Sequence, residues 1–355
     1  HIVQIRNKMK LHIHTDYPDE VKKILRESGK ISDLRIEDMA KEVAGEESVR
    51  KISIGIVTED IAMLLPKIIE KYQIEIASTK YEWLEEKDLP GENIYQKMRE
   101  AERRGIKTSV KTSQATPKDY LDAFEKQLKR FDKVLGITVT SKASGCYNSA
   151  CQAKEMLKED EKERVYILDS LQAAASQALL VLRAIELAQE QREIIEIIDE
   201  LKNLIPQTHL YLLFEDPKWV ESISRITKSQ ANWIRRMKKL RLHPLITLKN
   251  GMMAKAGVVF AKDMAETLFK KILKESQSAR KRSKTIRVVI GHADNLEAAE
   301  KLKKMLKDYN PRTGASAWRK ALASQPTTQQ GKFEIPFITP GPPIICAGAG
   351  PGTLL

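Results

Sequence analysis

The sequence predicts an α/β protein built around a parallel sheet, with at least two domains. Three observations carry this prediction. Short apolar runs alternate with segments of helical periodicity from residue 52 onward, which is the pattern of strands joined by covering helices. The clearest unit, residues 134 to 155, reads as a strand, a tight loop and a helix. The chain of 355 residues, 42% of them hydrophobic, is long enough to bury more than one core.

The first part of the chain, up to about residue 48, has a different pattern. Leu11 and Ile13 alternate with His12 and His14, which predicts a strand with both imidazoles on one face. Two such histidines can bind one metal ion, such as zinc, if another element supplies further ligands. Exposed strand histidines are the simpler interpretation. A helix over residues 19 to 27 follows.

The first α/β unit begins with an apolar strand that ends in Thr58, Glu59 and Asp60. A helix over residues 64 to 72, a strand over 74 to 78 and a helix over 93 to 104 follow it. Next comes the segment VKTSQATP, in which Thr112 and Ser113 precede a helix with a proline and an aspartate in its first turn.

The loop of the strand, loop and helix unit is rich in hydroxyl groups. Thr140, Ser141 and Ser144 lie before a helix, and Gly145 allows a ligand to approach the backbone closely. Free N–H groups at a helix N-terminus attract anions. The loop contains no acid or histidine, so its chemistry favours holding an anion over transforming it. A Ser144 that only caps the helix is an equally good local interpretation.

The second half continues the alternation. We expect a long helix that ends at Leu187 and a second helix over residues 192 to 205. A strand over 209 to 216, a helical stretch over 219 to 240, and a strand over 243 to 248 with a turn at Asn250-Gly251 follow. A helix over 263 to 275, a strand over 285 to 295 and a helix over 296 to 306 come next. The penultimate strand delivers His292 at its carboxyl end, where ligands of open α/β sheets bind. Residues 309 to 332 read as a loop, and a strand with a glycine-proline segment closes the chain.

Composition narrows the possible classes of function. The net charge is +13, but the lysines and arginines are mostly interleaved with acidic residues, which is typical of solvated helix faces. The one basic run, residues 280 to 284, is predicted to be a solvated loop. Aromatic residues are only 6% of the chain, so no stacking platform for nucleic acid is evident. Three cysteines are too few for a disulfide framework. Without an apolar run of membrane-spanning length, we expect a soluble, cytoplasmic protein.

Several motifs occur in an order that resembles the DegV family of bacterial fatty-acid-binding proteins. They are IVTED, KTSQA, VTSKASGCYNSA, YILDS, SRIT, LHPLITLKNG, VVIGHADN and GPPIICAGAGPG. The resemblance covers roughly residues 52 to 355 and implies two α/β domains of the EDD fold that clasp a long-chain fatty acid. By matching motifs, it assigns the ligand carboxylate to Thr112 and Ser144, with Ser113, Gly145, His292, Arg225 and Thr58 as further ligand-binding residues.

The N-terminal segment resembles the end of the middle domain of the kinase subunit of bacterial fatty acid kinase. Its HIHT motif matches one implicated in zinc binding in that domain, so the resemblance implies His12 and His14 as zinc ligands. The resemblance implies a fusion, with an ATP-binding kinase domain upstream as the partner, and domains over residues 1–48, 51–208 and 209–355. It further implies a non-catalytic lipid-binding part without a cofactor, with transient contact to a membrane surface possible.

Several positions depart from the family pattern, among them Pro342 and Pro343, which stand in place of Gly-Pro. Ile223 and Ser224 replace two glycines before Arg225, Gly348 stands where the family has a histidine, and Phe260 aligns with an arginine linked to kinase docking. A covalently tethered kinase has less need of such a docking residue, because tethering raises the effective concentration.

An enzymatic alternative stays open on the sequence. Ser144 and His292 could form the nucleophile and base of an esterase or other hydrolase. Against this, Ser144 does not lie in a GxSxG elbow, and no third orienting acid is evident.

Overall fold

The structure is a computed structural model that describes residues 2–5, 8–11 and 18–28, then 54–106, 110–240, 242–309 and 331–355. The chain divides into two compact units, His1–Lys51 and Ile52–Leu355. In the first unit, β1 (Ile2–Ile5) pairs antiparallel with β2 (Lys8–Leu11), and the predicted helix is present as α1 (Pro18–Ser28). His12 and His14 lie outside the described residues, so their zinc expectation stays a prediction.

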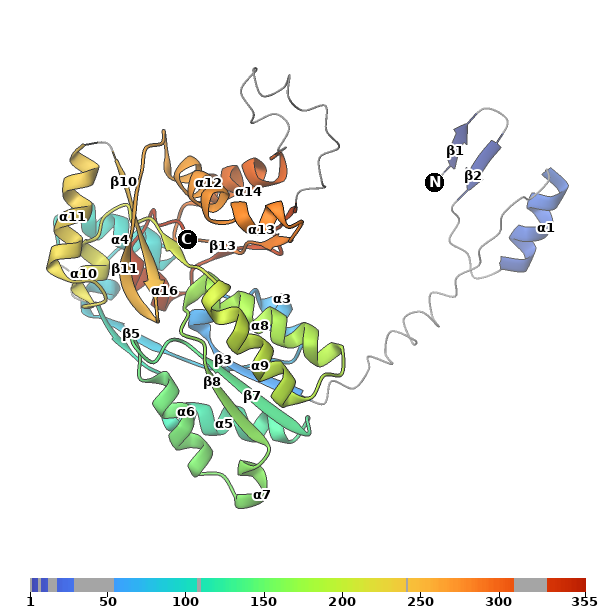
Figure 1. The fold of residues 1–355 in the computed structure, drawn as a ribbon, viewed down its shortest axis with the longest axis horizontal. Helices are drawn as coiled ribbons and strands as arrows, with labels where there is room; N and C mark the ends of the chain where they lie inside the picture. Colours follow the sequence, from blue (N-terminus) through green and yellow to red (C-terminus); the bar gives the residue numbers. More distant parts are fainter. Residues whose placement is uncertain are drawn as a thin grey trace. The chain divides into compact units, whose positions relative to one another are not determined.

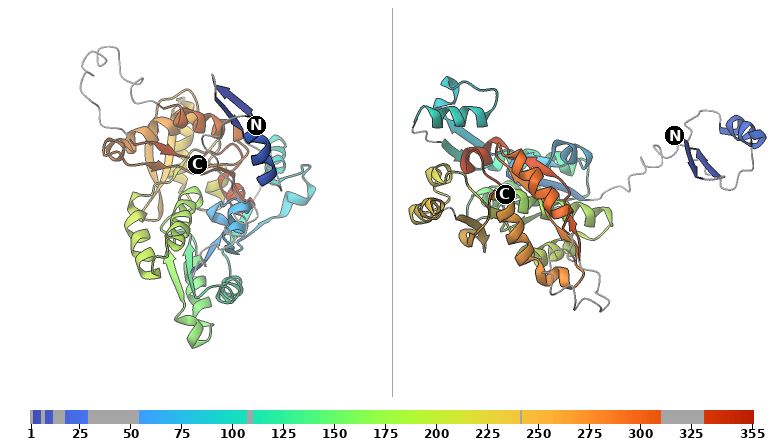
Figure 2. Two further views of the ribbon diagram at one scale, coloured as in Figure 1. Left: turned by 90° about the vertical axis from the view of Figure 1, so that its right-hand side faces the viewer. Right: turned by 90° about the horizontal axis from the view of Figure 1, so that it is seen from above.

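The second unit contains the predicted parallel sheet. Its strand order is β4-β3-β7-β8, and all three pairings are parallel. The strands are β3 (Ile54–Glu59), β4 (Glu75–Ala77), β7 (Lys133–Thr138) and β8 (Val165–Asp169). Helices α5 (Pro117–Leu128) and α6 (Cys146–Glu155) lie on one face, and α8 (Ala174–Gln189) and α9 (Ile194–Leu204) lie on the other (Figures 1 and 2).

The alternation of side chains along the strands explains this layering. Ile56 and Leu135 pack into the core formed with α8 and α9, whereas Val57 and Val134 pack into the core formed with α5 and α6. Successive residues of a strand point to opposite faces, so a strand that is apolar at every position needs cover on both sides. The continuous apolar runs of the sequence are therefore explained by two helical layers.

The remaining elements of the first half link the sheet to the second half. Strands β5 (Lys80–Trp83) and β6 (Val110–Ser113) form an antiparallel pair beside α4 (Ile94–Arg103). The short helical segments are η1 (Asp60–Ala62), α3 (Pro66–Lys71), η2 (Leu84–Asp88), α7 (Glu159–Lys162) and η3 (Ile205–Gln207).

The second half is built on shorter strands. An antiparallel sheet has the order β11-β10-β9, and two parallel pairs, β12 with β14 and β13 with β15, complete the half. The strands are β9 (Tyr211–Leu212), β10 (His243–Lys249), β11 (Met252–Val259), β12 (Ile286–Arg287), β13 (Ile290–His292), β14 (Phe333–Glu334) and β15 (Ile338–Pro340). The helices are α10 (Lys218–Ser222), α11 (Lys228–Lys239), α12 (Met264–Glu275), α13 (Gln277–Lys281), α14 (Leu296–Lys307) and α16 (Pro343–Ala349).

Three predictions for this half were wrong in detail. The helical stretch over 219 to 240 is broken into α10 and α11, because Ser224 adopts a left-handed φ of 57°. The strand over 285 to 295 is two short strands, β12 and β13, that pair with different partners. The closing glycine-proline segment contains a buried helix, α16.

Specific contacts connect the two halves of this unit. The rings of Trp83 and Trp219 meet edge to face with centroids 6.1 Å apart. The Arg99 guanidinium donates to both carboxylate oxygens of Glu215, at 2.9 and 2.7 Å. These contacts place the second half against β5 and α4 of the first. Among the described helices, none has both the length and the apolar character required to cross a membrane.

Candidate functional site

The loop between β7 and α6 presents unpaired donors, as the sequence predicted. The N-cap of α6 is Gly145, and no side chain caps it. The Ser144 hydroxyl accepts a hydrogen bond from the Cys146 N–H at 3.3 Å, and it lies half-buried. Within the described part of the chain, the N–H groups of Tyr147 and Asn148 have no acceptor. The loop therefore combines a hydroxyl with the open end of a helix, which suits an anion.

A second hydroxyl of the loop has a structural role. Thr140 is fully buried, and its hydroxyl donates to the Gly251 carbonyl at 3.0 Å. It also accepts from the Lys142 N–H at 3.2 Å. Gly251 belongs to the predicted turn between β10 and β11, and a Cβ on it would lie 2.3 Å from Thr140 Oγ1. Thr140 thus fixes the loop to the second half and has no free proton for a ligand.

The KTSQA segment lies beside the same loop. The Gln114 amide nitrogen donates to Ser149 Oγ at 2.9 Å, and a Cβ on Gly145 would lie 2.0 Å from Gln114 Oε1. Thr112 is two residues earlier, in β6, and is half-buried. No described group pairs with its hydroxyl, while Ser113 is exposed. The strand that carries Thr112 therefore ends against the loop that carries Ser144.

His292 lies at the carboxyl end of β13, as predicted, and is 8% exposed. The Asn295 N–H donates to its Nδ1 at 3.3 Å. Burial lowers the pKa of His292, against a smaller opposing effect of the Asp294 charge. A neutral imidazole with Nδ1 as acceptor carries its proton on Nε2. The structure thus favours a His292 that offers one donor and no positive charge.

Arg225 is a half-buried cation without a carboxylate partner among the described residues. Its one hydrogen bond runs from Nη1 to the Ile223 carbonyl at 3.3 Å. The left-handed φ of Ser224, at 57°, turns the chain just before it. A guanidinium held in this way can still pair with an anion.

Helix α16 is the common neighbour of these elements. Its residues Cys346 and Ala347 share a hydrophobic cluster with Val110, in the strand of Thr112. The N–H of Gly341, just before the helix, donates to the His292 carbonyl at 2.7 Å. The loop of Arg225 contacts the other side, because Ile223 Cδ1 lies 2.7 Å from where a Cβ on Gly348 would be. The elements that carry Thr112, His292 and Arg225 therefore pack around one short helix.

The contact between Ile223 and Gly348 explains two of the departures noted in the sequence. The isoleucine side chain occupies the space that any side chain at position 348 would need. The two residues therefore fit as a pair. Phe260, a further departure, follows the end of β11 and is 79% exposed, so it is free to contact a partner.

Thr58 lies apart from these open donors. It is fully buried, and its hydroxyl donates to the Ile137 carbonyl at 2.8 Å and accepts from Gln177 Nε2 at 3.0 Å. Its neighbour Glu59 accepts hydrogen bonds from the Tyr120 hydroxyl, from Gln177 at 2.7 Å and from the Val139 N–H at 3.1 Å. Sequence analysis did not single out Glu59, and the structure makes it the centre of a buried polar network.

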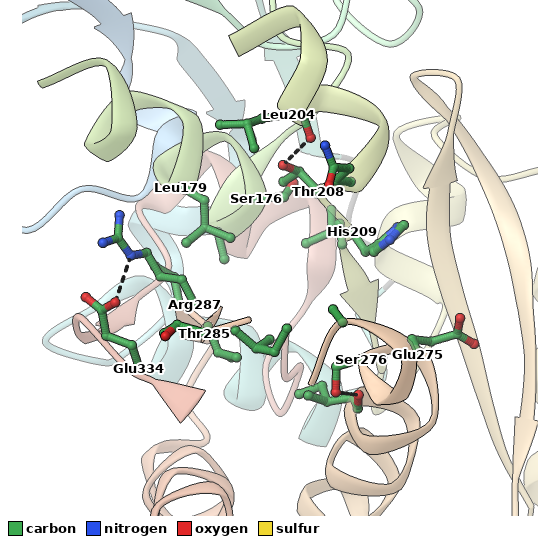
Figure 3. Close-up of a pocket in the computed structure, with 18 of the residues that line it drawn as sticks. Ser176, Leu179, Leu204, Thr208, His209, Glu275, Ser276, Thr285, Arg287 and Glu334 are labelled. Carbon is green, nitrogen blue, oxygen red and sulfur yellow. Dashed lines mark hydrogen bonds and ion pairs between the residues drawn. The ribbon is translucent and has the colours of Figure 1, made fainter. Parts of the chain in front are cut away.

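A cavity of about 760 Å³ lies between α8 and α9 on one side and β9, α12 and β12–β13 on the other (Figure 3). Its wall is mainly apolar, with Leu179 and Leu204 from the first half facing Ile290 from the second. An ion pair between Arg287 and Glu334, 3.3 Å apart, lies at its edge. None of the predicted site residues lines this cavity, although Ile290 precedes His292 by two positions on β13.

The described residues bring together no group of three or more histidine, cysteine, aspartate or glutamate side chains that could hold a metal ion. The open groups of the site are instead hydroxyl, N–H, imidazole and guanidinium donors. Such a set binds the oxygens of a carboxylate or phosphate.

Comparisons with known proteins identify the relatives of both units. Residues 53–319 match the family described as "Uncharacterised protein, DegV family", and residues 1–46 match the FakA-like middle domain of fatty acid kinase. A DegV domain-containing protein from Staphylococcus aureus is 30% identical over 268 residues, which are 73% of this chain and 88% of that protein.

Two solved structures have the same fold. A structure described as fatty acid binding of a DegV family protein from Thermus thermophilus matches with a TM-score of 0.64 at 22% identity, covering 85% of this chain and 97% of that one. The Streptococcus pneumoniae fatty acid kinase (Fak) B3 protein, loaded with linoleic acid, matches with a TM-score of 0.60 at 17% identity, covering 85% and 97%. These matches confirm the predicted α/β fold.

Proposed function

Because the chain belongs to the DegV family, we propose that it binds a long-chain fatty acid and presents the carboxylate for phosphorylation by a kinase domain. The observation that carries this proposal is the presence of anion donors together with a partly apolar cavity of about 760 Å³, whose lining residue Ile290 lies two positions from His292. A fatty acid has both matching parts, since its carboxylate needs donors and its chain needs apolar cover. One structural relative is described as fatty acid binding and the other as loaded with linoleic acid, which supports the same ligand class.

In this proposal, Thr112 and Ser144 hold the ligand carboxylate together with the N-terminus of α6. Both hydroxyls lie half-buried on elements that meet at Gly145. Arg225 supplies the positive charge, and neutral His292 donates from Nε2. Ser113 and Gly145 complete the edge of the site. A partly buried carboxylate with several donors and one cation keeps its charge, which leaves an oxygen able to attack a phosphoryl donor.

The acyl chain extends from this site into the cavity. Leu179, Leu204 and Ile290 give the cavity wall its apolar character. Each buried methylene contributes about 0.8 kcal/mol, so the tail supplies most of the affinity. This favours long-chain acids over short ones.

We propose a non-catalytic role, with phosphoryl transfer carried out by a kinase domain. The match of residues 1–46 to a fatty acid kinase middle domain supports a fusion in which that kinase domain lies on the same polypeptide. With the kinase on the same polypeptide, no docking arginine is needed at the exposed position of Phe260, which is 79% exposed. In this arrangement a tethered kinase reaches the carboxylate site at high effective concentration.

The hydrolase alternative fits the geometry less well. A catalytic base needs its second ring nitrogen to donate to an orienting acid, but Nδ1 of His292 accepts from the Asn295 N–H. The nearest hydrogen-bonding partner of the Ser144 hydroxyl is the Cys146 thiol at 3.2 Å, and no imidazole contacts it among the described residues. Ser144 thus has no base to activate it.

The deciding experiment is mass spectrometry of lipids extracted from the purified protein, with affinity measured by displacement of a fluorescent fatty acid. We expect one fatty acid per chain. Ser144→Ala and Thr112→Ala should each weaken binding about tenfold, since each removes a hydrogen bond to a charged group. Ser222→Ala, at an exposed residue of α10 whose hydroxyl donates to the Trp219 carbonyl, serves as the control. Unchanged affinity in both site variants would contradict the carboxylate assignment.

A chromogenic short-chain ester separates the two functions. A burst of product that disappears in Ser144→Ala would favour the hydrolase, and its absence together with bound fatty acid favours the presenter.

A further inference from the structure

Met63 occupies an unusual position for a methionine. It follows β3 and η1, is 2% exposed, and adopts a left-handed φ of 55°. Its N–H donates to the Asp60 carbonyl at 3.0 Å, which closes the turn after the strand. The side chain therefore leaves the first half and packs into a hydrophobic cluster of the second half, with Leu210 and Leu355.

Two members of that cluster also form the cavity wall. Leu210 and Leu355 both line the cavity, whereas Met63 does not. Met63 therefore lies directly behind the wall. Its flexible thioether chain contains no polar hydrogen-bonding group that would hold it in place.

Met63 lies on the side of the cavity wall that faces His292. A Cβ on Gly291 would lie 2.7 Å from Met63 Cε and 2.5 Å from Leu355 Cδ1. Gly291 stands between Ile290, which lines the cavity, and His292. The two side chains thus cover the one residue that separates the cavity wall from the histidine of the proposed carboxylate site.

A second set of packing contacts links the hydroxyl loop to the cluster that contains Met63. Cys146, which contacts Ser144, belongs to a hydrophobic cluster against which Ala173 packs. Ala173 also packs against the cluster of Met63. Ala173 therefore links the cluster behind the hydroxyl loop with the cluster that contains Met63.

We propose that Met63 is the specificity-determining residue that sets how long an acyl chain the protein accepts. This inference rests on the proposed function. In this proposal, the acyl chain runs from the carboxylate site into the cavity over Gly291, where the side chains of Met63 and Leu355 lie. A fatty acid binds when the methionine side chain moves aside, and the space it still takes up limits the length of chain that reaches the end of the cavity.

The test is a chain-length profile. The purified protein is loaded from an equimolar mixture of saturated fatty acids of 12 to 20 carbons, about the range a cavity of this kind accommodates, and the bound acids are quantified by mass spectrometry. Met63→Ala removes three heavy atoms and should shift the preferred chain toward longer acids. Each added methylene that becomes buried tightens binding about fourfold, so two should change the relative occupancy roughly fifteenfold. Met63→Phe puts a larger side chain at this position and should shift the profile toward shorter acids.

Met98→Ala is the matched control. Met98 is also fully buried, but it lies in a cluster with Trp83 and Ile94 that does not line the cavity. It should lower thermal stability as Met63→Ala does and leave the chain-length profile unchanged. Profiles that stay unchanged in both Met63 variants, while fatty acid is still bound, overturn the inference. Absence of fatty acid from the unmodified protein overturns the proposed function instead. Should Met63→Ala fail to fold, the shift expected for Met63→Phe decides the question.

Discussion

Two neighbouring polar regions at the carboxyl edge of the parallel sheet differ in how their hydrogen bonds are used. After β7, the Tyr147 and Asn148 N–H groups of α6 have no acceptor among the described residues, and the Ser144 hydroxyl bonds only to Cys146, two positions away. After β3, Glu59 and Thr58 are fully engaged by internal partners, Gln177 among them. Position at a strand end does not distinguish a ligand site from a structural network. The state of the hydrogen bonds does, because a donor already paired inside the protein must break that bond to hold a ligand.

The largest effect that this comparison predicts concerns stability. Glu59→Ala leaves the Tyr120 hydroxyl and the Val139 N–H without their acceptor in a buried position, and the Gln177 amide loses one of its acceptors. We expect a loss of about 3 to 4 kcal/mol in the free energy of unfolding. Urea unfolding at pH 6 measures it.

The control for this variant is Glu82→Ala, at an exposed position on β5, which should change stability by less than about 0.5 kcal/mol. Equal stabilities of Glu59→Ala and the unmodified protein would show that the Glu59 network is not structural.

The open region was easier to predict from the sequence than the closed one. Its strand, loop and helix lie within one short stretch, where hydroxyl residues, a glycine and helical periodicity follow one another. Local sequence also predicted the turn at Asn250 and Gly251, which have the left-handed φ values of 51° and 80° that this residue pair favours. Where structure depends on neighbours in the chain, sequence analysis succeeded.

The closed region depends on distant residues. The partners of Glu59 lie 61 and 118 positions away, at Tyr120 and Gln177. The sequence around Glu59 therefore could not distinguish a buried, hydrogen-bonded acid at a strand end from a solvated one. Helix α16 was missed because its glycines and prolines are typical of a loop, and its burial against β5, β6 and α10 stabilises it. The break at Ser224 was missed because the sequence around it has helical periodicity. These features follow from tertiary packing.

The pH dependence of stability tests the closed region in a second way. Burial raises the pKa of Glu59 from its ordinary value of 4.5 to about 7, against smaller opposing effects of the Tyr120, Gln177 and Val139 hydrogen bonds. The folded protein therefore holds this proton more tightly than the unfolded chain. The resulting stabilisation is fully present below pH 4.5 and is lost as the pH rises through about 7. It amounts to about 3 kcal/mol.

Glu59→Gln removes the titrating group while keeping its shape. Urea midpoints between about pH 5 and pH 8 should fall less with rising pH in this variant than in the unmodified protein. The same pH dependence in both proteins would mean that another group is responsible.

Arg225 tests the open region, because its guanidinium has no carboxylate partner among the described residues. Arg225→Ala should weaken fatty acid binding about twentyfold, as expected for loss of a charge-assisted hydrogen bond. Stability should change little, since the one bond lost inside the protein is to the Ile223 carbonyl. Displacement of a fluorescent fatty acid measures the affinity. Arg236→Ala, at an exposed position on α11, is the matched control. Equal affinities of these two variants would remove Arg225 from the site.

The smallest effect separates two hydroxyls of the same loop. Thr140→Val keeps the side-chain shape and removes the hydrogen bond to the Gly251 carbonyl, so it should cost about 1 kcal/mol of stability. Fatty acid affinity should stay within about twofold, because that hydroxyl has no free proton for a ligand. Ser144→Ala should show the reverse, with weaker binding and nearly unchanged stability. Measuring urea unfolding and fatty acid displacement on both variants therefore tests the comparison directly. A Thr140→Val variant that loses affinity as strongly as Ser144→Ala would show that the whole loop, and not the Ser144 hydroxyl, determines binding.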